Sequence, residues 1–190
     1  MNLAPEDYDF GNMDNFSFAM EVTCSSDEAR KMFILAYGHM LNYNHEEAIA
    51  CFSKCAELDP DCAMAWWGIA YCVSSNYNWT PGLGSGYDPI QMAISLKEGC
   101  SEMEQDLIDA LAERHSKEAR DAADPSVLNM GNSAELNIAF AEAMAPLYEK
   151  YSGNLDVTAI YVEALMNLKA WQLWNKDTKT GEITPADDNT

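Results

Sequence analysis

The residues with the clearest potential for chemistry are histidines and sulfur-containing side chains near a sharp turn. His39 and His45 stand six residues apart around an Asn-Tyr-Asn turn, and Cys62 and Met64 begin a later helix. Six residues is not the i,i+4 spacing that places two ligands on one helical face. Copper accepts soft sulfur ligands such as the Cys thiolate and the Met thioether. These four side chains form one candidate metal site, for copper, zinc or iron. The alternative is that His45 forms hydrogen bonds in the turn while Cys62 and Met64 belong to the core.

Other catalytic patterns are missing from the sequence. It contains no Gly-x-Ser-x-Gly, no glycine-rich phosphate loop with a lysine, and no Cys-x2-Cys pair. Three alternating glycines, at 82, 84 and 86, follow Thr-Pro rather than a strand, so we interpret them as loop residues. We assign no catalytic residue and expect no cofactor unless the metal site forms. Whether the protein is an enzyme stays open, and the sequence favours a protein that is not one.

The elements that must position these residues are helices, because apolar residues recur at helical spacing over nearly the whole chain. Ser25 and Ser26, followed by two acids, are typical of a helix N-terminus. Between the third and fourth expected helices, residues 74–87 form a long loop that is rich in glycine and aromatic residues. The expected helices are 29–41, 46–58, 63–73, 90–97, 102–116, 133–151 and 157–168.

A repeat accounts for the first three of these helices. Ala48, Phe52 and Pro60 stand at the spacing A-x3-F-x7-P, and Met32 and Trp66 are 34 residues apart. Both patterns are typical of the tetratricopeptide repeat. The sequence therefore predicts an all-α, tetratricopeptide-like solenoid of helical hairpins with one long aromatic and glycine-rich loop. We expect an acidic N-terminal arm over 1–24 and the repeat domain over 25–174. Residues 175–190 are expected to be a polar tail or the start of a further helix, signalled by Thr-Pro-Ala-Asp-Asp at 184–188.

In such a repeat, the first helix of each hairpin lines a concave groove. The residues at these positions are aromatic and include a single cation. An acidic peptide needs several charged donors, so an apolar helix or hydrophobic peptide fits better. The alternative is that the chain's own later helices, or further sequence, cover this face. The predicted groove residues are Arg30, Phe33, Tyr37, Met64, Trp67 and Tyr71, with Tyr77 and Trp79 of the long loop as a lid.

Two blocks of the chain resemble a group of tetratricopeptide-containing proteins that are mostly bacterial. The blocks are Asn44-His45-Glu-Glu-Ala48-Ile49 through Leu58-Asp-Pro-Asp-Cys62-Ala-Met64-Ala-Trp66-Trp67-Gly68 to Asn76-Tyr-Asn78, and Val162-Glu163-Ala164-Leu165-Met166-Asn167-Leu168 to Trp174. The resemblance covers about residues 30–175. It implies that the chain is similar to the front part of longer proteins, which continue into His-rich helical repeats. A metal-dependent activity in that group would need those later histidines.

Charge and composition restrict the classes of partner that the protein is expected to bind. The 190 residues include 11 Lys and Arg against 31 Asp and Glu, which gives a formal charge of −20. Such a chain is not attracted to phosphates, so we expect no nucleic acid partner and no membrane insertion. With no secretory signal and six cysteines in helical patterns, we expect reduced thiols and a cytoplasmic or other intracellular location. The favoured function is a scaffold or adaptor that binds a peptide or partner protein. The alternatives are part of a metal-dependent enzyme and an accessory subunit of a large complex.

Overall fold

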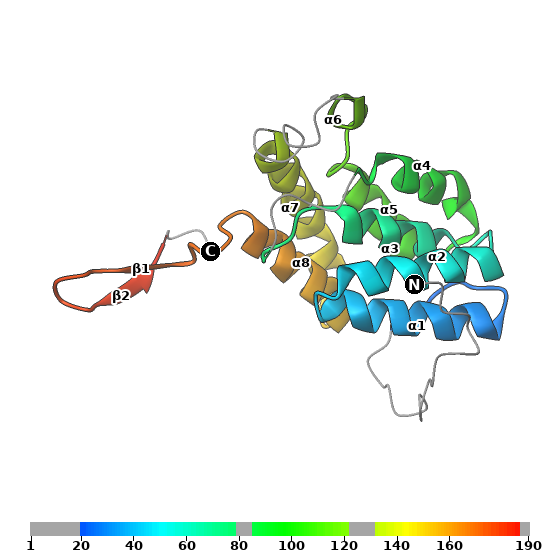
Figure 1. The fold of residues 1–190 in the computed structure, drawn as a ribbon, viewed down its shortest axis with the longest axis horizontal. Coiled ribbons are helices and arrows are strands. Elements are labelled where there is room, and N and C mark those ends of the chain that lie inside the picture. The colour runs from blue at the N-terminus through cyan, green and yellow to red at the C-terminus, as the bar shows by residue number, and fades with distance from the viewer. Residues whose placement is uncertain (1–19, 79–84, 122–131, 187–190) are drawn as a thin grey trace.

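The computed structural model describes residues 20–78, 85–121 and 132–186, and this part of the chain is mostly helical (Figure 1). The prediction of an all-α fold is confirmed, apart from two short strands near the C-terminus. The elements are α1 (Asp27–Leu41), α2 (His45–Leu58), α3 (Ala63–Val73), α4 (Tyr87–Leu96), a 3-10 turn (Lys97–Gly99), α5 (Glu102–Ala112), α6 (Lys117–Asp121), α7 (Asn132–Lys150), α8 (Leu155–Asn167), β1 (Trp174–Lys176) and β2 (Ile183–Pro185).

Side-chain caps fix where several helices begin. The Ser26 hydroxyl accepts a hydrogen bond from the Ala29 backbone N–H at the start of α1. Asn154 accepts one from the Val157 N–H at the start of α8. At α5, Ser101 and Glu104 form a reciprocal capping box. These caps satisfy backbone donors that have no partner within the helix.

Helix α3 is the centre of the fold. It packs against α2 and α4, its neighbours in sequence, and against α1 and α5. Nine of its eleven residues are buried, as expected for a helix that is surrounded on most sides. Figure 1 shows α7 and α8 as an antiparallel pair beside this layer. The core therefore runs from α1 and α2 through α3 to α5, α7 and α8.

The C-terminal segment differs from the sequence prediction. Thr184 and Pro185 lie in β2, which pairs antiparallel with β1, and no helix begins there within the described residues. Gly181 has a φ of +75° in the connecting turn, a conformation that glycine adopts without strain. The hairpin extends away from the helices (Figure 1). In addition, a five-residue helix, α6, lies between the expected helices 102–116 and 133–151.

None of the helices in the described part of the chain is long and apolar enough to cross a membrane.

Candidate functional site

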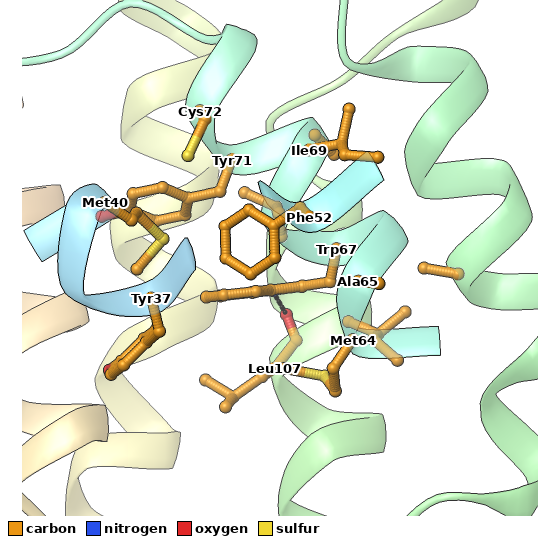
Figure 2. Packing of buried hydrophobic residues seen from close by; sticks show 14 of the residues in the cluster. Tyr37, Met40, Phe52, Met64, Ala65, Trp67, Ile69, Tyr71, Cys72 and Leu107 are labelled. Atoms are coloured by element: carbon orange, nitrogen blue, oxygen red, sulfur yellow. Dashed lines mark hydrogen bonds between the residues drawn. The ribbon is translucent and has the colours of Figure 1, made fainter. Parts of the chain in front are cut away.

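The expected floor of the concave groove lies inside the protein. The side chains of Phe33, Met64 and Trp67 have no exposed surface, and Tyr37 and Tyr71 are each 2% exposed. The Trp67 indole N–H donates a hydrogen bond of 3.1 Å to the Leu107 carbonyl of α5 (Figure 2). The prediction that these aromatic side chains are exposed is corrected, because later helices of the same chain pack over them.

Helix α8 covers the same face and accepts hydrogen bonds from two tyrosines, one in α1 and one in α3. The Tyr37 hydroxyl donates to Asp156 at 2.9 Å, and the Tyr71 hydroxyl donates to Glu163 at 2.6 Å. Burial, together with the facing carboxylate, raises the pKa of both tyrosines well above its usual value. Both phenols therefore stay neutral donors, and they fix α8 against α1 and α3.

The remaining groove residues have other roles. Arg30 donates hydrogen bonds to the carbonyls of Val22 and Cys24, so its charge holds the N-terminal segment in place. Tyr77, expected in the lid, stacks on Trp171 with ring centroids 5.4 Å apart. Trp79 lies outside the described residues.

The predicted metal ligands are not brought together. His39 lies in the last turn of α1 and His45 is the first residue of α2, whereas Cys62 follows the other end of α2. A helix of 14 residues spans about 20 Å, so no single ion reaches both His45 and Cys62. Met64 is buried in α3 as a core residue. Cys62 instead lies beside the thiols of Cys24 and Cys55.

A polar pocket of about 480 Å³ surrounds His45. His45 Nδ1 lies 3.1 Å from the Cys72 carbonyl, and Nε2 is buried without a hydrogen-bond partner. Burial lowers the pKa of His45, and nearby Glu163 opposes this effect. The pocket therefore holds a largely neutral imidazole with one unsatisfied nitrogen, which can bind water or another small polar group. The lining residues are Tyr43, Asn44, His45, Glu46, Glu47, Ser74, Asn76 and Asn78.

No sequence pattern predicted this pocket. Asn76 and Asn78 belong to the long loop, and the Asn76 amide nitrogen lies 3.2 Å from His45 Nδ1. The sequence signal for this pocket is the presence of polar residues at both ends of the first block of resemblance, which runs from Asn44 to Asn78. A contact over 31 residues joins those ends, and this contact depends on the packing of α2 against α3.

The outer face of α8 is apolar and exposed. Leu155, Ala159, Val162 and Met166 recur at a spacing of three to four residues, opposite to the buried Val157. Leu155 is 74% exposed and Val162 is 46% exposed. Beside this stripe lies an apolar pocket of about 290 Å³ between α8 and the hairpin. The pocket is lined by Val162, Leu165, Met166, Leu173, Trp174 and Pro185.

The neighbouring helix α7 presents carboxylates on its outer face. Glu135, Glu142 and Glu149 are exposed and follow one another at seven-residue intervals. Ile138 lies on the same face and is 47% exposed. The ring contact between Tyr148 of α7 and Tyr161 of α8, with centroids 5.3 Å apart, joins the two helices. We call the Leu155, Ala159, Val162 and Met166 stripe together with this acidic row the outer face.

Comparisons with known proteins gave no match. No family model matches the chain, no curated protein is similar to it, and no solved structure is similar to it.

Proposed function

We propose that this chain is a protein-interaction module that binds a basic, amphipathic helix of a partner protein on the outer face. The observation that carries the proposal is the exposed apolar stripe on α8. Exposed apolar residues that gather along one helix mark interaction surfaces in folded proteins. This proposal retains the binding role that the sequence predicts. It assigns the binding surface to the outer face instead of the concave side.

The stripe has the shape of a helix-binding site. Leu155 and Met166 are 11 residues apart, so the stripe runs for about 16 Å along α8. A partner helix of three turns covers that length with apolar residues at a three-to-four residue spacing. The adjoining apolar pocket beside Trp174 can accept one larger side chain as an anchor.

Charge determines which kind of helix fits. The three glutamates lie on the exposed face of α7, the helix that packs against α8, and the whole chain carries a formal charge of −20. Opposite charges across an interface increase the rate of association and suppress wrong partners. A helix with Lys or Arg along one edge is therefore favoured, and a second copy of this acidic chain is not.

The arrangement of helices supports a tetratricopeptide-type architecture for the module. The two helices α1 and α2 form a hairpin, and α3 begins the next unit within one residue of the predicted position. Phe52 of α2 packs directly against Gly68 of α3, which brings the hairpin close to the first helix of the next unit. In such a solenoid each hairpin buries one face against its neighbour, and the outer face of α8 lacks this neighbour among the described residues.

A designed peptide tests the proposal without a known partner. The probe is a helical peptide of about 18 residues with leucines on one face and lysines beside them, compared with its leucine–glutamate counterpart. We expect the lysine peptide to bind and to slow amide hydrogen exchange in α8. The double variant Val162→Asp with Met166→Asp should weaken this binding by at least about tenfold.

The matched control is Met92→Asp, because Met92 is an exposed apolar residue on α4 that is 42% exposed. All these variants add negative charge. Binding by charge alone would therefore become stronger in each of them, whereas docking on the stripe becomes weaker only in the double variant. Equal binding of the two peptides, or unchanged binding by the double variant, would overturn the proposal.

A further inference from the structure

Three cysteine thiols meet in the interior near one end of α2. The sulfur atoms of Cys24, Cys55 and Cys62 all lie within 4.8 Å of one another. Among the described residues, this is the one group of three His, Cys, Asp or Glu ligands close enough to share an ion. Cys55 and Cys62 are buried, and Cys24 is half-buried, which leaves a route from solvent.

Three different elements supply these cysteines. Cys55 belongs to the last turn of α2 and Cys62 is the N-cap of α3, so the short Asp-Pro-Asp turn brings them together. Their sulfur atoms are 3.9 Å apart. Cys24 comes from the extended segment that precedes α1. A thiol pair from α2 and the start of α3 is thus completed by a separate segment that precedes α1.

Long-range hydrogen bonds hold the segment that carries Cys24. The Thr23 backbone N–H and hydroxyl donate to the Glu104 carboxylate of α5, at 2.7 and 2.6 Å. Arg30 binds the Cys24 carbonyl at 2.9 Å, and the Ser25 N–H donates to Asp59. The position of the third thiol is therefore fixed by contacts to α1, α5 and the turn after α2, as a preorganised ligand requires.

The spacing of the sulfur atoms suits a metal ion. A zinc–thiolate bond is about 2.3 Å long, which places two ligating sulfur atoms about 3.8 Å apart in a tetrahedral site and about 4.0 Å apart in a trigonal one. The 3.9 Å between Cys55 and Cys62 falls between these values. It is far longer than the disulfide bond of about 2.05 Å.

The Cys62 sulfur accepts hydrogen bonds in this cluster. The hydrogen bond from the Cys55 thiol, and then the Ala65 backbone N–H at the start of α3, lower the pKa of Cys62. Burial raises the pKa of Cys24 to about 12, so an ion must displace protons from the other thiols. Asp59, which is 4% exposed, accepts a hydrogen bond from Cys24 and lies outside the group of three sulfur atoms.

We propose that Cys24, Cys55 and Cys62 bind one Zn²⁺ ion through their three sulfur atoms. The three thiols lose their protons to solvent as three zinc–sulfur bonds form, and no electron is transferred. Soft sulfur ligands without histidine select zinc over magnesium or calcium. The ion ties the N-terminal segment to α2 and α3, which is a structural role separate from the proposed function of the outer face.

Cobalt titration of the reduced chain is the first test. We expect one Co²⁺ per chain with a thiolate-to-cobalt charge-transfer band, and displacement of the Co²⁺ by Zn²⁺. Cys55→Ala should lower the affinity by more than about tenfold. The control is Cys72→Ala, because Cys72 is also a fully buried thiol in a helix and should leave the affinity unchanged.

A second measurement uses the unaltered chain, so that it does not depend on how a variant folds. Alkylation of Cys24 and of Cys100 is followed by mass spectrometry with and without Zn²⁺, since both thiols are half-buried. We expect Zn²⁺ to slow the alkylation of Cys24 and not that of Cys100. The absence of the charge-transfer band, an equal loss in the Cys72 variant, or equal protection of both thiols would each overturn the proposal.

Discussion

The indole N–H of Trp67 donates a 3.1 Å hydrogen bond to the backbone carbonyl of Leu107, which joins α3 to α5. Both residues are buried, with 0% and 1% of their surface exposed. The bond crosses the face that the repeat pattern predicts to be a binding groove. Trp67 therefore connects two layers of the core.

Replacement of Trp67 should lower the free energy of unfolding of the protein. We expect Trp67→Ala to lower the free energy of unfolding by about 3–5 kcal/mol, because it removes a large buried ring and leaves a cavity. Trp67→Phe retains most of the ring and loses the hydrogen bond, so its cost should be smaller. Urea unfolding followed by circular dichroism measures both. An alanine variant with unchanged stability would mean that Trp67 is not part of the core.

Two glycines should respond to alanine in opposite directions. A Cβ atom at Gly68 would lie 2.4 Å from Cζ of Phe52, whereas one at Gly38 would meet nothing within 4 Å. Gly68→Ala should cost about 1–3 kcal/mol through overpacking. Gly38→Ala, within α1, should stabilise the fold by about 0.5–1 kcal/mol. Thermal unfolding compares them, and a Gly68→Ala variant that is as stable as the wild type would contradict the packing at Phe52.

The helices could be predicted from the sequence because their signals are local. The expected third helix, 63–73, has the same bounds as α3, and the expected second helix differs from α2 by one residue at its start. Apolar spacing, caps and the Asp-Pro-Asp turn determine these ends. The local helix signal at 184–188 failed for the opposite reason. Thr184 pairs with Asn175, and strand pairing replaced the local helix signal.

The candidate sites depend on contacts that no local pattern contains. The groove is closed by α5 and α8: Trp67 bonds to Leu107, 40 positions later, and Tyr71 bonds to Glu163, 92 positions later. The thiol cluster depends on Thr23 reaching Glu104, 81 residues away. Cys62 was identified from the sequence as a possible ligand, but its partners in space are other cysteines. Spacing within one repeat specifies which side chains point inward, and does not specify which later helix covers them.

Acid should destabilise the fold partly through His115. Burial, and then the positive charge of Arg114, lower the pKa of His115 from about 6.5 to about 3. The unfolded chain therefore binds a proton that the folded chain does not. The stability from this group is present above pH 6.5 and is lost as the pH falls toward 3, with a slope of at most about 1.4 kcal/mol per pH unit.

Comparison with His115→Gln isolates this contribution. Urea midpoints are measured for both proteins from pH 7 down to the lowest pH at which they fold. We expect the wild-type curve to fall more steeply below pH 6.5 than the curve of the glutamine variant. Parallel curves would show that His115 binds the same number of protons in both states.

The same substitution, valine to aspartate, at two positions of α8 should distinguish its buried face from its exposed face. Val157 is fully buried, whereas Val162, five residues later, is 46% exposed. Val157→Asp places a charge in the core and should cost roughly 3–5 kcal/mol or prevent folding. Val162→Asp should change the free energy of unfolding by less than about 0.5 kcal/mol, because the carboxylate stays in water. Urea unfolding measures both, and a large loss for Val162→Asp would mean that the stripe packs against this chain itself. A stable Val162→Asp protein is the one whose weakened peptide binding can be assigned to the outer face, since its fold is intact.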